Sequence, residues 1–451
     1  LDTTIANVAV PTIRAELGAS GAALQLVIGG YAIAYSMLLI TGARLGDIYG
    51  RRRVYLTGVA VFAVSSLVCG LAPNISVLVV ARFVQGAAAA ATVPQVMSII
   101  QLKFTGRARA VAFSAYSAVM SVGMVLGLVI GGTLVSANLF GTSWRPVFLV
   151  NIPIALAILA VLPRLLPADV PTASRRLDLV GLAISLPAVS LMIVPLVLGR
   201  EFGWPAWTFG SMAVGAILAV VFVTVEQRIG ARGGDPLVDL TVLRFPGLAL
   251  GVASLALMML AYAGFLFAFS LHLQSGLGDT ALRTGMTLTP MAVVFGAVGF
   301  SWARLPESVQ HLLPAVALGL CVLGYLGLVV GMRDGSQTSP VMWGALSLIG
   351  AGLGLGIGSL VTHSVRFVPP AKVGDASGLV MTTMQLAGVV GVAAIGSVFL
   401  SLDDRPGALG SAHAISMTSW LLVSAAVGGV VAASALARSI SNRGRDTDLL
   451  D

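Results

Sequence analysis

Charged residues are scarce in this sequence: Asp, Glu, Lys and Arg together make up 10% of its 451 residues. A soluble globular domain contains about 25% of such residues. Hydrophobic residues account for 57% of the chain, so the composition excludes an ordinary soluble protein. It predicts an all-α membrane protein that crosses the bilayer several times.

Cysteine, histidine and lysine are also rare, and their scarcity excludes several kinds of site. The two cysteines, Cys69 and Cys321, lie in separate apolar runs, so there is neither a disulfide framework nor zinc-finger spacing. The four histidines are scattered and form no metal-ligand or nucleophile–base pattern. We therefore expect no enzyme activity, no metal and no cofactor. Lysine occurs only at Lys103 and Lys372, and a chain rich in Arg, Ala, Gly and Val is typical of a GC-rich bacterial genome.

Long apolar runs occupy most of the chain. Runs of about 20 residues between charged or Pro/Gly breaks predict fourteen membrane spans. They lie near 1–13, 22–42, 54–72, 76–102, 109–136, 144–165, 178–199, 206–227, 245–273, 284–302, 310–331, 340–366, 374–401 and 415–437. As a helix, the first run would rise only about 20 Å, which is short of a hydrocarbon core of roughly 30 Å. We therefore expect the first helix to be truncated, with missing N-terminal residues completing it.

The distribution of positive charge indicates an orientation. If the N-terminus is cytoplasmic, cytoplasmic segments hold nineteen of the 26 Lys and Arg residues, outer segments hold six, and Arg82 lies within a span. This asymmetry explains the net charge of +8 without a nucleic-acid partner. Charged, Pro-containing breaks at 163–176 and 228–244 divide the spans into six, two and six. We expect an N-terminal six-helix bundle (1–165, first helix truncated), a cytoplasmic linker with two extra membrane helices (166–234), and a C-terminal six-helix bundle (235–451).

Two charges fall within the predicted spans of the first bundle. A cation at the bilayer centre costs roughly 3 kcal/mol or more, so Arg82 is a candidate functional residue. Gln85 and Gly86 share its helix face, which suits an aqueous cavity or a close helix neighbour. The alternative is an Arg that extends to the membrane interface or binds a backbone carbonyl. Asp2 is the second charge, and its alternative is a hydrogen-bonded structural carboxyl.

The loop between the second and third spans combines one acid, several arginines and three glycines. Asp47 and Arg51 are four residues apart and can pair on a helix, and the glycines permit a tight turn. This loop resembles the signature loop of the major facilitator superfamily, in which an acid–Arg cluster latches the cytoplasmic side. Asp47, Gly50, Arg51 and Arg52 match that pattern and are implied to form a cytoplasmic gate. Ala43 and Ile48 depart from it.

Further segments resemble the fourteen-helix drug/proton antiporter branch of that superfamily, and the likeness covers nearly the whole chain. Residues 1–11 resemble its first-helix motif, 143–153 the start of its sixth helix, and 272–278 and 374–379 parts of its second half. Arg82, Gln85 and Gly86 match a fourth-helix motif associated with proton coupling. The resemblance implies two pseudo-symmetric bundles that rock around a central site. It also implies proton coupling through Asp2, Arg82 and Asp375, although an acid at a helix start, such as Asp375, is also favoured by the helix dipole.

The fifth span carries glycines suited to close helix packing. These helix-packing candidates are Gly123, Gly127, Gly131 and Gly132. Leu128 stands where the antiporters usually have Pro, so the resemblance supports the fold more strongly than antiport.

Aromatic and methionine side chains at helical spacing are candidates for a substrate surface, because such side chains adapt to varied apolar ligands. The alternative is packing against lipid or another helix. The predicted substrate-lining residues are Tyr31, Tyr35, Gln85, Tyr116, Tyr262, Phe265, Phe269, His272, Met381, Met384 and Gln385.

Together these features predict a proton-coupled secondary transporter that exports drugs or amphipathic or cationic small molecules by alternating access. A lipid or polar-metabolite transporter of the same fold is the first alternative, and a membrane-embedded enzyme is the second. The expected partners are a small-molecule substrate, protons and the lipid bilayer. We expect a monomer in the bacterial cytoplasmic membrane, with its N-terminus in the cytoplasm.

Overall fold

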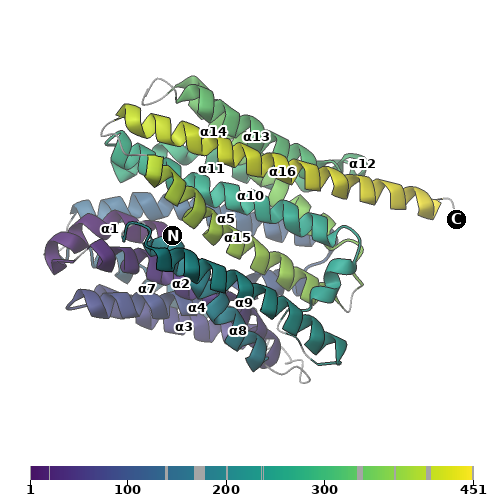
Figure 1. Ribbon diagram of the computed structural model, residues 1–451, viewed down its shortest axis with the longest axis horizontal. Helices are drawn as coiled ribbons and strands as arrows, with labels where there is room; N and C mark the ends of the chain where they lie inside the picture. The colour runs from purple at the N-terminus through teal and green to yellow at the C-terminus, as the bar shows by residue number, and fades with distance from the viewer. Residues whose placement is uncertain are drawn as a thin grey trace. The chain divides into compact units, whose positions relative to one another are not determined.

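Helices account for all the regular secondary structure in the part of the chain that the computed structural model describes (Figure 1). The described residues are 2–19, 21–137, 141–166, 178–199, 202–234, 236, 238–332, 339–369, 372–402 and 408–448. The chain divides into two compact units: unit 1 comprises Leu1–Ile99 and Leu126–Thr241, and unit 2 comprises Ile100–Val125 and Val242–Asp451.

The helices of the first half are α1 (Asp2–Leu17), α2 (Gly21–Tyr49), α3 (Arg51–Gly70), α4 (Ile75–Lys103), α5 (Gly106–Ala137), α6 (Pro146–Leu149), α7 (Asn151–Leu165), α8 (Leu179–Leu198) and α9 (Ala206–Ala231). Those of the second half are η2 (Leu240–Arg244), α10 (Leu248–Leu271), η3 (His272–Gly276), α11 (Ala281–Ser301), η4 (Trp302–Arg304), α12 (Glu307–Gln310), α13 (Leu313–Gly331), α14 (Pro340–Ser364), α15 (Val373–Leu402) and α16 (Ala408–Asp448).

Ten helices among the described residues are long and apolar enough to cross a bilayer, so the protein is a multi-pass membrane protein. They are α3, α4, the α6–α7 pair, α9, α10 with the start of η3, α11, α13, α14, α15 and α16. The other four predicted runs coincide with α1, α2, α5 and α8. Of these, α2 and α8 contain shorter apolar segments at Gly29–Leu39 and Leu179–Pro195.

Helix boundaries follow local sequence chemistry. Asp178, Thr280 and Ser339 each accept a backbone N–H of the first turn of the following helix, which satisfies a donor that has no partner within the helix. The predicted run at 144–165 is interrupted at Val150 and forms two helices. Because Pro153 has no N–H to donate to the carbonyl four residues earlier, the α-helical ladder is broken there.

Glycines let α2 and α4 approach closely in unit 1. A Cβ at Gly42 would overlap the backbone of Ala90, and a Cβ at Gly86 would overlap the carbonyl of Tyr31. The extra helices α8 and α9 pack on each other, and α8 packs on α2, so both belong to unit 1. The α2–α4 contact is the one that positions Arg82 beside α2.

Of the glycines predicted to allow close packing of α5, Gly131 contacts another helix and Gly132 does not. A Cβ at Gly131 would lie 2.8 Å from Cγ1 of Ile5 on α1, whereas a Cβ at Gly132 would meet nothing within 4 Å. We expect Gly131→Leu to destabilise the protein by about 1–3 kcal/mol through overpacking, and Gly132→Leu to be nearly neutral. Unfolding midpoints of the two purified variants in detergent check this difference. Equal midpoints would contradict the assignment of Gly131 to the α1 contact.

Unit 2 is built around α10. Helices α15, α16 and α14 pack against it, α13 packs on α14 and α16, and α11 packs on α14 (Figure 1). The rings of Phe265 and Phe269 stack with centroids 5.1 Å apart, and Phe265 also meets Tyr325 at 5.8 Å. All three rings are fully buried, so these aromatic side chains form part of the interior of this unit.

Candidate functional site

An ion pair lies in the interior of unit 1. Asp2 is in the first turn of α1, and Arg82 is about two turns into α4. Nη1 of Arg82 donates to Oδ2 of Asp2 at 2.7 Å, and the two side chains are 1% and 9% exposed, respectively. Arg82 therefore does not extend to the interface, and the two charges that the sequence places inside spans neutralise each other.

Neutral donors complete the environment of the carboxylate. Nε2 of Gln85 donates to Oδ1 of Asp2 at 3.2 Å, and Nδ2 of Asn151 donates to the same oxygen at 2.9 Å. Gln85 Nε2 also lies 2.7 Å from Oγ of Ser66. One carboxylate oxygen thus binds the cation, and the other accepts hydrogen bonds from two amides. A buried carboxylate needs such partners, because it has lost its hydrogen bonds to water.

Arg82 has partners beyond Asp2. Its Nε donates to the carbonyl of Val27 at 2.9 Å, and its Nη1 donates to Oε1 of Gln85 at 2.6 Å. Its guanidinium carbon lies 4.7 Å from the ring centroid of Tyr31 and 5.7 Å from that of Phe148, within cation–π range. The guanidinium would therefore keep acceptors and ring contacts if the carboxyl became neutral.

The sequence singled out Asp2, Arg82, Gln85 and Tyr31, and the structure brings these four together. It missed the roles of Ser66 and Asn151. The signal for Asn151 was present, because a polar amide stands within a predicted apolar run just before Pro153. Ser66 carries no comparable signal.

The predicted cytoplasmic gate residues also lie in unit 1. Nη2 of Arg51 contacts Oδ1 of Asp47 at 2.6 Å, and both side chains are partly exposed. Gly50 between them has φ 89°, a backbone conformation that favours glycine and lets α3 begin directly after α2. Arg52 donates to the carbonyl of Pro163 on α7 at 2.7 Å.

Arg44 is buried near the same end of α2. The predicted gate did not include this residue. Its Nη2 donates to the carbonyl of Pro236 at 2.7 Å. Glu226 of α9 is also buried and accepts the backbone N–H of Val238 at 2.8 Å. The segment after α9 is thereby tied both to α2 and to α9 within unit 1.

The predicted substrate-lining residues differ in exposure. Tyr31 and Tyr35 stack on α2 with centroids 6.1 Å apart and are partly exposed. Phe265 and Phe269 expose no surface and pack within unit 2, whereas Tyr262 of the same helix is partly exposed.

The remaining lining candidates lie on α5, η3 and α15. Tyr116 on α5 is partly exposed, and Met381 and Met384 on α15 are largely buried. His272 is buried, and its Nδ1 lies 3.0 Å from Oγ of Ser411. The side chain of Gln385 lies outside the described residues.

The remaining proton-coupling candidate, Asp375, lies in the first turn of α15 and belongs to unit 2. Within the described residues, no group of three His, Cys, Asp or Glu side chains is arranged to hold a metal ion.

Ionisable side chains buried among apolar membrane helices mark a candidate functional site, and comparison with known proteins gives the family. A family model described as Major Facilitator Superfamily matches residues 1–392. The chain belongs to the major facilitator superfamily. Membership of this superfamily, which the sequence motifs predicted, is therefore confirmed. The family and the fold of this protein are those of transporters.

Several curated relatives of this superfamily member have names that refer to drugs or natural products. It is 38% identical to a probable actinorhodin transporter of Streptomyces coelicolor, over 89% of this chain and 70% of the relative. It is 33% identical to a cephamycin export protein of Amycolatopsis lactamdurans (87% and 81% covered) and 30% identical to the multidrug resistance protein Stp of Mycobacterium tuberculosis (88% and 73% covered).

Solved structures support the same fold. The proton:xylose symporter XylE of the major facilitator superfamily matches with a TM-score of 0.60 at 15% identity, over 94% of this chain and 90% of that one. At this level of identity the likeness concerns the fold alone.

Proposed function

We propose that this protein is a proton-coupled antiporter that exports drugs or amphipathic or cationic small molecules by alternating access. Membership of the superfamily and the names of the relatives support export of such compounds. The observation that carries proton coupling is the buried Asp2–Arg82 pair, since an ionisable group inside a membrane bundle is costly and marks a functional site.

The network gives Asp2 two protonation states that the surroundings can accommodate. When ionised, the carboxylate is stabilised by Arg82, Gln85 and Asn151. When protonated, it is neutral and no longer requires the cation. Arg82 then keeps its bonds to the Val27 carbonyl and to Gln85. Protonation thus leaves the Arg82 cation without its anionic partner, but still hydrogen-bonded and in contact with the Tyr31 and Phe148 rings.

The proton gradient supplies enough free energy for export. One inward proton supplies about 2.3 kcal/mol per 100 mV and about 1.4 kcal/mol per pH unit. A potential of about 150 mV alone would hold a neutral substrate at a gradient of about 300-fold, because about 1.4 kcal/mol corresponds to a factor of ten.

In the proposed architecture, fourteen membrane helices form two six-helix bundles, and α8 and α9 are the inserted pair. The N-terminus faces the cytoplasm of a bacterium, and the protein works as a monomer in the cytoplasmic membrane. The partly exposed tyrosines of the predicted set are proposed to contact the substrate; they are Tyr31 and Tyr35 in unit 1 and Tyr116 and Tyr262 in unit 2. Asp375 is a second candidate for the proton, and Gly127 and Gly131 support close helix packing during the rocking motion.

The Asp47–Arg51 pair, with Arg52, is proposed to form part of the cytoplasmic gate. Asp47→Asn removes a charge-assisted bond of 2.6 Å and should bias the protein toward the inward-open state. Cysteine accessibility of cytoplasm-facing positions, measured in membrane vesicles, checks this. Arg53→Gln is the matched control, because Arg53 is exposed in the same Arg cluster. An unchanged open fraction in Asp47→Asn would exclude the gate assignment.

A transport assay tests the proposed function. The purified protein in proteoliposomes, under an imposed pH gradient, should accumulate a lipophilic cationic dye and release protons in step with it. A protonophore should abolish the accumulation. A panel with a neutral antibiotic, a lysophospholipid and a polar metabolite distinguishes drug export from lipid or metabolite transport. Transport that ignores the protonophore would overturn proton coupling while leaving the transporter assignment intact.

A further inference from the structure

One face of α1 carries an acid at each end and an apolar stretch between them. Asp2 is followed at helical spacing by Ile5, Ala9 and Ile13, and then by Glu16. Fourteen residues of helix place the two acids about 21 Å apart along the axis. Asp2 is in the buried network, whereas Glu16 is about one-third exposed, so the apolar stretch separates the network from solution at this end.

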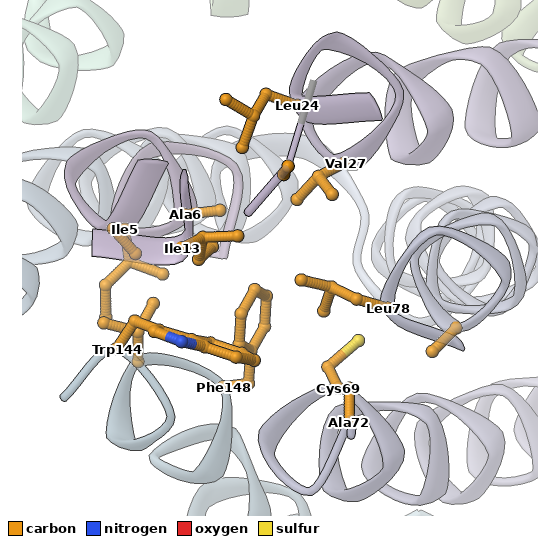
Figure 2. Packing of buried hydrophobic residues seen from close by; sticks show 14 residues of the cluster. Ile5, Ala6, Ile13, Leu24, Val27, Cys69, Ala72, Leu78, Trp144 and Phe148 are labelled. Atoms are coloured by element: carbon orange, nitrogen blue, oxygen red, sulfur yellow. The ribbon is translucent and has the colours of Figure 1, made fainter. Parts of the chain in front are cut away.

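Two aromatic rings of α6 and its preceding turn close this stretch from the side. Trp144 and Phe148 are fully buried, and their rings meet edge to face with centroids 6.0 Å apart. In Figure 2 the Trp144 indole extends toward the Phe148 ring, Ile5 lies beside Trp144, and Leu78 and Cys69 lie on the other side of Phe148. Because the Phe148 ring also lies 5.7 Å from the guanidinium of Arg82, the aromatic pair extends from the surface turn to the ion pair itself.

Glu16 holds the tryptophan in place. Its Oε2 accepts Nε1–H of Trp144 at 2.9 Å and a bond from Nη1 of Arg145 at 2.9 Å. Arg145 also stacks over the Trp144 ring, with its guanidinium carbon 4.8 Å from the centroid. A single carboxylate thus fixes the indole at its only polar atom.

The turn before α6 is bent to make these contacts. Ser143 has φ 55°, a left-handed conformation that is costly for a residue with a side chain and persists only where the surroundings enforce it. Partial burial tends to raise the pKa of Glu16, but hydrogen bonds from Ser143, Arg145 and Trp144 outweigh it, so the pKa is lowered. The carboxylate of Glu16 is therefore ionised when it holds the turn.

We propose that Trp144 and Phe148, with the apolar residues of α1 between Asp2 and Glu16, form a seal that keeps water and protons from reaching Asp2 at this end. Glu16 is the positioning residue that holds Trp144 in the seal. The proposal rests on the proposed proton coupling, since a seal at this place matters for transport only if Asp2 carries the proton. It adds that protons reach Asp2 by a different route.

Removing the indole should open the seal. Trp144→Ala leaves a cavity beside Phe148 and the ion pair, and water enters a cavity that is roomy and has polar partners. Trp144→Phe keeps an aromatic ring but loses the N–H that binds Glu16, so it should open the seal less than Trp144→Ala does. Glu16→Gln keeps the core unchanged but weakens the bond to the indole, so it should open the seal partly.

Cys69 is a built-in reporter of this opening. It is fully buried in the same cluster, and its Sγ lies 3.9 Å from Oε1 of Gln85. The chain has two cysteines, so a Cys321→Ala background leaves Cys69 as the only thiol. We expect a water-soluble methanethiosulfonate to label Cys69 at least about tenfold faster in Trp144→Ala, because labelling follows the population of the open form. Trp207→Ala, which removes an exposed indole of α9, is the matched control.

The labelling rates of Cys69 test the seal without measuring transport. Faster labelling in Trp144→Ala and in the well-folded Glu16→Gln variant, with the control unchanged, supports it. Wild-type labelling rates in both variants overturn it, and so does equal acceleration by Trp207→Ala. Glu16→Gln keeps the test decisive if Trp144→Ala fails to fold, because that variant leaves the buried rings in place.

A proton-leak assay then separates the seal from the proton site. Without substrate, Trp144→Ala proteoliposomes should dissipate an imposed pH gradient faster than the wild type, and the double variant Asp2→Asn/Trp144→Ala should not. A leak that persists in the double variant contradicts Asp2 as the proton carrier, and thus the proposed function. Faster Cys69 labelling in the same samples would still support the seal.

Glu16 also gives the seal a predictable pH dependence. Its folded-state pKa lies below the ordinary value of 4.5, so the stability it contributes is fully present above pH 4.5 and is lost as pH falls through the folded pKa. Among the described residues, the charged group that contacts Glu16 is Arg145. The difference in thermal midpoint between wild type and Glu16→Gln should therefore be present at pH 7 and shrink below pH 4.5. A difference that grows at low pH would contradict the clamp.

Discussion

Asp2→Asn should abolish uphill export while leaving the binding of a neutral substrate largely intact. An asparagine resembles the protonated carboxyl in shape and charge, but it cannot release a proton. Under a potential of about 150 mV, the accumulation ratio should fall from about 300 toward 1, since no proton free energy reaches the substrate. Downhill exchange of the substrate should continue.

The structure also predicts that this variant remains folded. Arg82 loses its anionic partner but keeps the Val27 carbonyl and Oε1 of Gln85. Asn151 still has an amide oxygen within reach at position 2. We therefore expect a measurable loss of stability without loss of the fold, because the cation stays hydrogen-bonded.

The measurement is substrate-driven proton release from proteoliposomes at several pH values. Asp279→Asn is the matched control, because Asp279 is a second buried aspartate that pairs with an arginine, Arg283, at 3.2 Å in unit 2. It should leave proton release unchanged. Wild-type proton release by Asp2→Asn would exclude this residue as the carrier and move the assignment to Asp375.

Local rules were enough to predict the elements and the candidate residues of this network. Hydropathy placed helices where the structure has them, and the cost of a charge in a membrane singled out Asp2 and Arg82 separately. Gln85 followed from its position three residues after Arg82 on the same helix face.

The contacts between helices could not be predicted in the same way. Asp2 and Arg82 are 80 residues apart, and their meeting depends on how α1, α2 and α4 pack. That packing is set by small residues such as Gly86, whose backbone lies against Tyr31, and no single-helix pattern encodes it. The same limit explains Asn151 and Ser66, which reach the network from α7 and α3.

Helix periodicity also could not separate lining residues from packing residues. Tyr262, Phe265 and Phe269 share a helix face in the sequence, yet only Tyr262 is partly exposed. The difference comes from Tyr325 on α13, which covers Phe265 and lies 60 residues away. A row of aromatic residues on one helix face therefore indicates either a packed face or a face that lines a cavity. The neighbouring helices determine which of the two it is.

The second large effect is expected from Arg82. Arg82→Gln leaves the Asp2 carboxylate in the interior of unit 1 with only amide partners. Breaking a buried pair by removing one partner typically costs about 3–5 kcal/mol, because the remaining charge is uncompensated.

A double variant tests whether Asp2 and Arg82 act as a pair. In Asp2→Asn/Arg82→Gln neither position carries a charge, and amides occupy both positions of the 2.7 Å contact. Its thermal midpoint should therefore recover most of what Arg82→Gln loses, and the double variant should lose less stability than the sum of the losses in the two single variants. Proton release should stay absent, because neither residue titrates. If the double variant is as unstable as the sum of the two single variants, Asp2 and Arg82 do not act as a pair, and the network cannot hold the proton as proposed.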